Sequence, residues 1–457
     1  MAEQISMFDG SQQFKITKPI RLIECFAGYG SQALALKYLG ANFEHWKIAE
    51  WAVKSIQAYK DIHFTDDNTD YSSQYDKEWL IDYLFEKGIS ADYNKPMTRE
   101  QIARMGEEKI RTVYNNIIAT HNLVSVCNVR GEDLEITDTE HFTYLLTYSF
   151  PCQDLSICGK QKGMRRDSGT RSSMLWEIER ILEDCKERGQ LPQILLMENV
   201  PQVHSQENVD SFYEWINFLE SIGYKSKWRD LNTKNYGVPQ TRDRTFLVSV
   251  FGDFYTTFPE PIRLEKTLND ILEENVPEKY YLKDYNIDTT TRTKSEALTN
   301  EPKCVQVGSL CGGKWDKMHE QSRRVYSVGG ICPTIPTSCG GNHEPKIAEV
   351  VGGIGEKKSN GGTQYYQQDR IYKGEIALSH PANLPSGSYY YVVEEQNEES
   401  VSLRVRKLTP RECFRLMGVK DEDFDKVKKN QSTSSLYHLA GDSIVVDVLM
   451  AIFNEIL

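Results

Sequence analysis

Short apolar runs alternate with helix-like patterns through the first half of the chain. Residues 20–26 are mostly apolar and predict a buried strand, and a glycine-containing turn leads from them into an expected helix over 32–39. Gly40 ends that helix, because glycine tolerates the left-handed conformation in which many helices stop. A second pair follows, with a strand expected over 43–50 and a helix over 52–60. This alternation predicts an α/β fold built around a sheet.

The strand-and-helix pattern is interrupted once and then resumes. Residues 61–120 are mostly polar and helical in pattern, so we expect a helical insertion between strands of the sheet. Beyond the insertion we expect strands over 123–127, 144–150, 193–197 and 245–251, and helices over 173–188 and 209–222.

The pattern of residues along the sequence changes after Pro259. Residues 260–400 contain glycine pairs, clustered tyrosines and few long periodic runs, which is typical of irregular strands and long loops that carry recognition surfaces. Helical pattern returns over 410–417 and 444–456. We therefore expect a sheet domain formed by 1–259 and 401–457, with 260–400 inserted as a smaller domain rich in loops and strands.

Composition narrows the class of protein. The chain is 39% hydrophobic and 26% charged, an ordinary balance for a soluble globular protein. No apolar run approaches the roughly 20 residues of a membrane span, and the polar N-terminus does not resemble a secretion signal. The ten cysteines are scattered rather than arranged as a disulfide framework, which favours the reducing cytoplasm.

The charge of the chain leaves its partner open. A net charge of −12 argues weakly against nucleic acid, but phosphate binding depends on local cation density. Between Gly159 and Ser173 there are five basic residues and one acidic residue. On charge alone, a solvated loop is the better interpretation of this segment.

A glycine-containing turn and an acidic residue point to a cofactor site. The segment 26–30, Phe-Ala-Gly-Tyr-Gly, lies between a strand and a helix, where glycines let the backbone approach a ligand. Glu50 ends the next strand and suits the ribose hydroxyls of an adenosine-type cofactor, and Trp51 could stack on its adenine. The alternatives are an ordinary turn at a sheet edge and a core tryptophan.

Candidate catalytic groups follow three later strands. Cys152 comes directly after a strand, with Pro151 fixing the backbone before it, and is well presented as a nucleophile. Glu198 ends the apolar strand over 193–197 and should lie at the same sheet edge. Arg242 and Arg244 alternate just before the next strand. The alternatives are a buried structural cysteine and a solvated carboxylate.

Six segments occur in the order found in DNA cytosine-5 methyltransferases. They are 26–30, Pro151-Cys152-Gln153, Glu198-Asn199-Val200, Gln240-x-Arg242-x-Arg244, the run 406–412 and Gly441-Asp442-Ser443. The chain resembles this family, and the run 146–156 and the insertion at 61–120 resemble its phage-type members. The resemblance implies a Rossmann-like, S-adenosylmethionine-dependent methyltransferase sheet domain, with 260–400 in the place of the target recognition domain.

The resemblance also implies a mechanism. The thiolate of Cys152 adds to carbon 6 of cytosine, which lets carbon 5 accept the methyl group of S-adenosyl-L-methionine. Glu198 hydrogen-bonds ring nitrogen 3 and the exocyclic amine. Arg242 and Arg244 together hold the base's carbonyl oxygen and orient the carboxylate, and the resemblance does not assign these two roles to one arginine each. Because stacked neighbours block both faces of the ring, the cytosine must be flipped out of the duplex. The basic segment 160–171 then becomes the loop that closes over DNA in this family.

Motif position assigns two further sets of residues. The cofactor-binding set is Phe26, Gly28, Tyr29, Gly30, Glu50, Trp51, Asn128, Leu175 and Ser443. The DNA-binding set is Gln153, Cys158, Lys160, Gln161, Arg165 and Arg166.

Three positions depart from the family pattern. Ser31 stands where the family usually repeats glycine, and Asn128 where an acid normally meets the adenine amine. Asp442 replaces the usual asparagine of the last motif, which puts a carboxylate near the cofactor and could weaken its binding.

Other interpretations remain open. Cys304, Cys311, Cys332 and Cys339 form two C-x6-C pairs, but structural zinc pairs are usually spaced by two to four residues, so we expect no metal. An RNA cytosine-5 methyltransferase would lack the large domain at 260–400, and a silent DNA-binding relative would not need an intact Cys152 and Glu198. We expect a monomer that acts on double-stranded DNA in the cytoplasm, encoded by a bacterium or a phage, with a cognate restriction endonuclease as a candidate partner.

Overall fold

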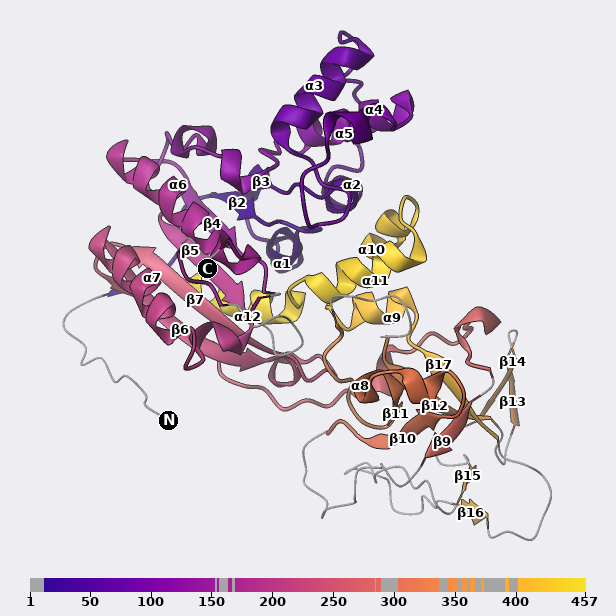
Figure 1. The fold of residues 1–457 in the computed structure, drawn as a ribbon. Helices are drawn as coiled ribbons and strands as arrows, with labels where there is room; N and C mark the ends of the chain where they lie inside the picture. The colour runs from indigo at the N-terminus through magenta and orange to yellow at the C-terminus, as the bar shows by residue number, and fades with distance from the viewer. Residues whose placement is uncertain are drawn as a thin grey trace.

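The computed structural model describes most of the chain (Figure 1). The described residues are 12–152, 154–155, 163–166, 169–283, 285–288, 303–336, 344–351, 356–359, 362–365, 371–373, 391–393 and 402–457.

A six-stranded sheet forms the centre of the larger part of the molecule. In spatial order its strands are β3 (Phe43–Ala49), β2 (Ile20–Cys25), β4 (Thr143–Tyr148), β5 (Ile194–Asn199), β7 (Asp243–Phe251) and β6 (Tyr224–Asn232). The first four are parallel, and β7 runs antiparallel to both of its neighbours. The chain leaves β2 for β3 on one side and later returns to β4 on the other, which creates the crevice where ligands bind in such sheets. The α/β, Rossmann-like fold expected from the sequence is confirmed.

Helices cover both faces of this sheet, because successive strand side chains point to opposite sides. Leu145 packs on one side with α1 (Ser31–Leu39) and α12 (Val446–Ile456). Leu146, the next residue, packs on the other side with α6 (Leu175–Glu187) and α7 (Val209–Ser221). The two apolar layers fix the register of every central strand and hold the strand ends in place.

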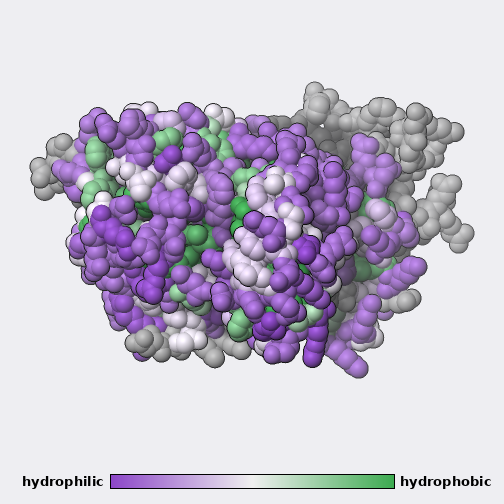
Figure 2. All heavy atoms as spheres, turned by 90° about the horizontal axis from the view of Figure 1, so that it is seen from above, coloured by the Kyte–Doolittle hydropathy of each residue, from purple (hydrophilic) through white to green (hydrophobic). Residues whose placement is uncertain are grey.

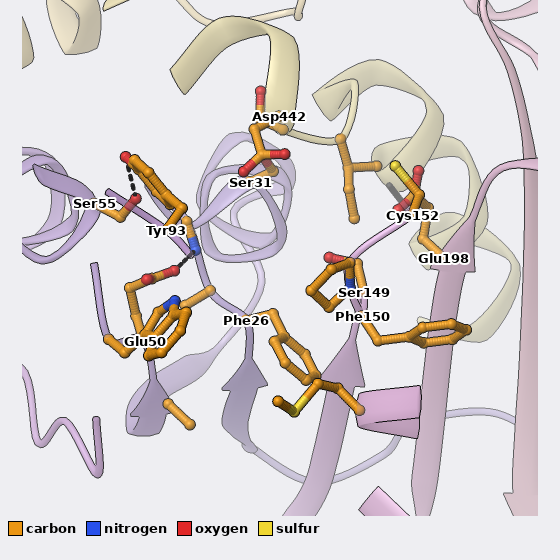
Figure 3. A pocket seen from close by; sticks show the side chains of 18 of the residues that line it. Phe26, Ser31, Glu50, Ser55, Tyr93, Ser149, Phe150, Cys152, Glu198 and Asp442 are labelled. Carbon is orange, nitrogen blue, oxygen red and sulfur yellow. Dashed lines mark hydrogen bonds between the residues drawn. The ribbon is translucent and has the colours of Figure 1, made fainter. Parts of the chain in front are cut away.

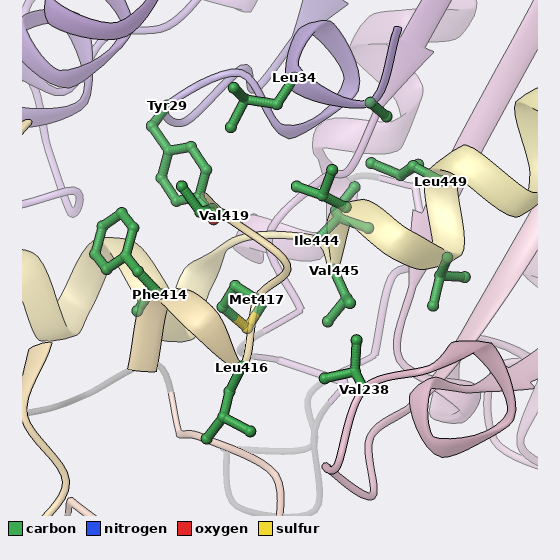
Figure 4. Packing of buried hydrophobic residues seen from close by; sticks show 14 of the residues in the cluster. Tyr29, Leu34, Val238, Phe414, Leu416, Met417, Val419, Ile444, Val445 and Leu449 are labelled. Atoms are coloured by element: carbon green, nitrogen blue, oxygen red, sulfur yellow. The ribbon is translucent and has the colours of Figure 1, made fainter. Parts of the chain in front are cut away.

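The C-terminal helices close the face that carries α1 (Figure 4). These helices are α9 (Pro410–Arg415), α10 (Asp421–Lys428), α11 (Thr433–Asp442) and α12. The stretch Thr433–Ile456 is long and apolar enough to cross a membrane, but 72% of its most apolar window is buried inside the protein. Its apolar character is therefore explained by its place in the core.

The insertion expected over 61–120 is helical and has an apolar cluster of its own. It contains α3 (Lys77–Lys87), α4 (Arg99–Ala103) and α5 (Glu107–Ala119), which follow α2 (Val53–His63). Leu80, Leu84, Ile110 and Ile117 are buried in that cluster.

Hydrophilic residues dominate the face of the molecule seen from above, and hydrophobic residues show there only as small separate areas (Figure 2).

A second sheet lies in the C-terminal half of the chain. Its order is β17 (Ser402–Lys407), β12 (Lys346–Val351), β11 (Arg324–Ser327), β10 (Gln306–Cys311) and β9 (Asn286–Asp288). The remaining short elements are β1 (Gln12–Gln13) with β8 (Phe254–Tyr255), β13 (Glu356–Ser359) with β14 (Gly362–Tyr365), β15 (Ile371–Lys373) with β16 (Tyr391–Val393), and α8 (Glu320–Arg323). Because β17 pairs with β12 along its whole length, this sheet extends past residue 400.

The structure differs from the sequence prediction in three places. The strand expected over 123–127 is wrong: the segment turns at Val124, whose φ is +70°, and continues as a 3-10 helix over Val126–Asn128. Strand β6 was not anticipated, since it is a sheet edge with exposed polar side chains. Helices α10 and α11 were also missed, because their short, polar-rich turns interrupt the helical period.

Candidate active site

A large cavity opens at the carboxyl ends of β2, β3, β4 and β5 (Figure 3). It is lined by Phe26, Ala27, Gly28, Tyr29, Ser31, Gln32, Ala49, Glu50, Trp51, Ser55, Tyr93, Asn94, Val124, Ser125, Val126, Cys127, Ser149, Phe150, Pro151, Cys152, Arg171, Met174, Glu198, Asn199, Val200, Arg242, Arg244, Leu439, Gly441, Asp442, Ser443 and Ile444. The cavity therefore joins residues from both ends of the chain with the candidate catalytic groups.

The glycine-containing turn forms one wall of the cavity. Gly28 has a φ of +57° and no atom within 4 Å of the place where a Cβ would stand, so its backbone is open to the cavity. Gly30 serves a different purpose, because a Cβ there would lie 2.4 Å from Nε2 of His63. Gly30 does not line the cavity, and its lack of a side chain allows the close packing of α1 against α2.

Glu50 is fixed beside this turn by two backbone groups. Its Oε2 accepts a hydrogen bond from the amide of Gly28 at 2.9 Å, and its Oε1 accepts one from the amide of Ala52 at 2.7 Å. Burial raises the pKa of Glu50 to about 7, although these two bonds oppose the rise. The carboxyl group is thus held in one orientation at the end of β3.

The C-terminal part of the chain supplies the opposite wall. The hydroxyl of Ser443 lies 2.7 Å from that of Tyr29, to which it donates a hydrogen bond, and the ring of Tyr29 stacks on Phe414 at 5.4 Å between centroids. Asp442, at the end of α11, also lines the cavity.

Cys152 is held at the rim of the same cavity by the segment after β4. Its carbonyl accepts the amide of Leu155 at 3.0 Å, and the carbonyl of Pro151 accepts the hydroxyl of Ser172 at 2.7 Å. Burial raises the pKa of the Cys152 thiol, and the nearby Arg244 opposes the rise. The thiol is partly buried yet faces the cavity.

Glu198 and Arg244 form an ion pair next to Cys152. The distance from Nε of Arg244 to Oε1 of Glu198 is 3.0 Å, and both side chains are largely buried. Burial raises the pKa of Glu198, while Arg244 and Arg242 lower it. The ion pair holds the Glu198 carboxyl group in one orientation, and the balance between burial and the two arginines sets its pKa.

Backbone carbonyls, rather than Glu198, hold the side chain of Arg242. Its guanidinium donates to the carbonyl of Ile335 at 3.0 Å, to that of Gly441 at 3.0 Å and to that of Ser443 at 2.9 Å. Only 2% of the residue is exposed, and burial lowers its pKa to about 9. Arg242 thus ties β7 to the loop after β11 and to the end of α11, which leaves Arg244 as the arginine that orients Glu198.

Besides Gly30, two more residues expected in the cofactor pocket do not line the cavity. The side chain of Asn128 donates to the carbonyl of Glu86 at 3.3 Å, and Leu175 is fully buried in the core at the start of α6. The residues immediately before them, Cys127 and Met174, line it instead.

The expected DNA-binding set is only partly described. Gln153, Cys158, Lys160 and Gln161 lie outside the described residues. Arg165 is exposed to solvent. Arg166 forms ion pairs with Glu179 at 2.6 Å and Glu214 at 2.7 Å, and its guanidinium stacks over the ring of Trp176.

Sequence reasoning missed the contribution of the insertion. Tyr93 and Asn94 reach the cavity from the loop between α3 and α4, and Ser55 reaches it from α2. The Tyr93 hydroxyl lies 3.1 Å from that of Ser55 (Figure 3), and the Tyr93 ring packs on His438 at 4.3 Å. The left-handed backbone of Tyr93, with φ of +61°, is unusual for an aromatic residue. No local sequence signal marks it.

The zinc alternative gains no support from the part of the chain that the structure describes. There, no group of three His, Cys, Asp or Glu residues is arranged to hold a metal ion. Cys332 is buried in the apolar core, and Cys339 lies outside the described residues.

Comparison with known proteins identifies the family. Residues 87–457 match the family model described as C-5 cytosine-specific DNA methylase, so the chain belongs to this family of methyltransferases. The chain is 31% identical over 443 residues to the type II methyltransferase M2.ScrFI of Lactococcus lactis subsp. cremoris, covering 96% of this chain and 99% of that protein. It is 34% identical to the orphan methyltransferase M.SssI of Spiroplasma monobiae, covering 73% and 83% of the two chains. Other relatives are orphan methyltransferases of Bacillus phages.

A solved structure supports the same fold. The Entamoeba histolytica methyltransferase EhMeth superimposes with a TM-score of 0.55 at 12% identity, covering 96% of this chain and 98% of that one. At this identity the likeness concerns the fold alone.

Proposed function

We propose that this DNA cytosine-5 methyltransferase transfers a methyl group from S-adenosyl-L-methionine to carbon 5 of a flipped-out cytosine within a specific duplex sequence, through a covalent bond from Cys152 to carbon 6. The observation that carries the proposal is the convergence of Cys152, the Glu198–Arg244 pair and the glycine-containing turn on one cavity.

The residues of the cavity fit the proposed cofactor. The open backbone at Gly28 suits close contact with a ligand, and the aromatic rings of Phe26 and Trp51 suit an adenine. Glu50 would accept the ribose hydroxyls, and Ser443 would bind the amino acid end. When bound, S-adenosyl-L-methionine supplies an electrophilic methyl group.

Cys152 performs the first chemical step in this proposal. Its thiol loses a proton and its sulfur adds to carbon 6, which makes carbon 5 an enamine-like nucleophile. Arg244 favours the thiolate because it lowers the pKa that burial raises. After methylation, the carbon-5 proton leaves and the bond from sulfur to carbon 6 breaks.

Glu198 balances the charge of the ring during that addition. With its pKa raised by burial, the carboxyl group can hydrogen-bond ring nitrogen 3 in protonated form. Arg244 holds the carboxyl group in the orientation that this bond requires.

The substrate must be an unstacked base, since neighbouring bases cover carbon 6 in a duplex. We infer that 260–400 with β17 selects the sequence, while the larger sheet carries the reaction. The bacterial and phage origin of the relatives supports action in the cytoplasm of a bacterial cell.

The decisive variant is Cys152→Ala. It should abolish transfer of tritiated methyl groups to duplex DNA, while S-adenosylhomocysteine binding by calorimetry changes little, because the thiol is needed only for the covalent step. Wild-type protein incubated with cofactor and a duplex carrying 5-fluorocytosine at the target should form a complex that survives denaturation. Full methyl transfer by the alanine variant would remove Cys152 from the mechanism.

A further inference from the structure

The carboxylate of Asp442 differs from the other charged groups around the cavity. The oxygens of Glu50 accept backbone amides, Glu198 is paired with Arg244, and Arg242 donates to carbonyls. Among the described residues, the Asp442 carboxylate has no hydrogen bond or ion pair. Figure 3 shows it between Tyr93 on one side and Cys152 on the other.

The charge of Asp442 acts on groups on both walls of the cavity. Its charge raises the pKa of Glu50 on one wall and those of Cys152 and Glu198 on the other. Burial raises the pKa of Asp442 itself, and His438, one turn earlier on α11, and the two arginines oppose that rise. Because both arginines already have partners, the negative charge of Asp442 remains available to a ligand.

The two small molecules that would occupy this cavity differ in charge. The methyl donor carries a sulfonium as well as an ammonium and a carboxylate, so its net charge is positive. The demethylated product has a neutral thioether in place of the sulfonium, so its net charge is zero. A carboxylate in a partly desolvated cavity attracts the first more strongly than the second.

We propose that Asp442 makes this cavity favour the cationic methyl donor over its neutral product. The inference rests on the proposed cofactor and adds a specificity residue to it. Transfer of the methyl group removes the sulfonium charge from the ligand, so the attraction to Asp442 weakens when the product forms. Asp442 then promotes replacement of the product by a new donor molecule.

The test measures binding without DNA, so that no reaction occurs. Three probes are titrated calorimetrically: S-adenosyl-L-methionine, S-adenosylhomocysteine, and sinefungin, in which an amine supplies a positive charge close to the place of the sulfonium. In the wild-type chain the two cationic probes should bind more tightly than the neutral product. Asp442→Asn should reduce that preference on the order of tenfold, because it removes the charge and keeps the shape.

Two controls separate charge from structure. Asp442→Glu keeps the carboxylate and should keep the preference for cationic probes, even where the longer side chain weakens all three. Asp210→Asn removes an exposed carboxylate of α7 outside the cavity and should change nothing. An unchanged ratio in Asp442→Asn, or tighter binding of the neutral product by the wild-type chain, would overturn the inference. Absence of binding by all three probes would instead overturn the proposed cofactor.

Discussion

Arg242 and Arg244 are two residues apart in the sequence, yet they have separate environments. Arg244 contacts the carboxylate of Glu198, and Arg242 donates to three backbone carbonyls, two of them in buried bonds and one in a part-buried bond. A buried carbonyl that loses its donor destabilises the fold by about 1–3 kcal/mol. The same residue type therefore contacts a carboxyl group of the cavity at one position and holds backbone carbonyls at the other.

This division predicts opposite phenotypes for two alanine variants. Arg244→Ala should lower kcat by at least about a hundredfold with a small change in Tm, because Glu198 loses its orientation. Arg242→Ala should lower the free energy of unfolding by about 2–4 kcal/mol, since three carbonyls lose their donor. Methyl-transfer rates and urea unfolding of both variants provide the check. Equal stability of the two variants would contradict the assignment.

The buried carboxyl group of Glu24 should make the free energy of unfolding depend on pH. It accepts the hydroxyl of Tyr59 at 2.5 Å and the amide of Ala33 at 3.4 Å beneath the glycine-containing turn. Burial raises its pKa from 4.5 to about 7. A raised carboxyl pKa favours the folded state below the unfolded value, so this contribution is complete below pH 4.5 and is lost as the pH rises to about 7.

The variant Glu24→Gln should flatten this part of the profile. Urea unfolding at several pH values between about 5 and 8 should show that the wild-type free energy of unfolding decreases by a few kcal/mol more than that of the variant. Some slope should remain, because the pKa of Glu50 is raised to about 7 as well. Identical slopes for the two proteins would mean that Glu24 does not titrate in this range.

At the scale of elements, the segment before α6 is fastened to the body of the protein at Arg166. Its guanidinium contacts Glu179 and Glu214 and lies over Trp176, whereas Arg165 next to it has no ion pair among the described residues, although both arginines are exposed. An arginine with two carboxylate partners must give them up before it can contact a phosphate. The neighbouring exposed arginine has no such cost.

Salt dependence of DNA binding should distinguish the two arginines. Replacing both with alanine should weaken binding on all sequences and reduce the slope of log K against log salt by up to about two contacts. Arg165→Ala alone should account for about one contact, a slope change of about 0.9, and Arg166→Ala for less. Binding of S-adenosylhomocysteine without DNA serves as the control and should not change. An unaltered salt slope in the double variant would mean that neither arginine contacts DNA phosphates and that the segment is a solvated surface loop.

At the scale of the whole molecule, two sheets divide the described chain. The cavity lies at strand ends of the larger sheet, and the second sheet continues to Lys407, where β17 pairs with β12. The buried ion pair of Arg406 with Glu412 joins the end of β17 to α9. A boundary at 400 would therefore separate a strand from its sheet.

Exchange of the second sheet should transfer sequence choice. A graft of 260–407 from a relative with another target should move methylation to that target, since base contacts specify and phosphate contacts position. A graft of 260–400 should fold less well, because the host's β17 must then pair with a foreign β12. Sequencing of methylated cytosines in a host expressing each graft gives the result. An active graft with the original target would show that selection lies elsewhere.

The sequence predicted the parts of the fold that depend on local pattern. Strands β2, β4 and β5 contain short apolar runs, and the six ordered motifs led to Cys152, Glu198 and the cavity around Gly28. It could not predict the edge strand β6, whose polar side chains carry no core signal. The strand expected over 123–127 failed because its apolar residues pack from a turn rather than from a sheet.

The direction in which individual side chains point was the second feature that could not be predicted from the sequence. Cys127 and Met174 line the cavity in place of Asn128 and Leu175, because 3-10 geometry at both sites decides which of two adjacent residues faces inward. Tyr93 reaches the cavity only through a left-handed backbone in a loop of the insertion. Such contacts depend on tertiary packing, which no window of sequence contains.

The hydroxyls of Tyr29 and Ser443 meet in the cavity although 414 positions separate them along the chain. A ribosome that has translated the glycine-containing turn must therefore add that many further codons before the opposite wall exists. Cys152 leaves the exit tunnel long before Ser443 does. Exposure of the Cys152 thiol and completion of the cavity are thus separated in time, because a growing polypeptide presents this thiol before the wall that contains Ser443 has been synthesised.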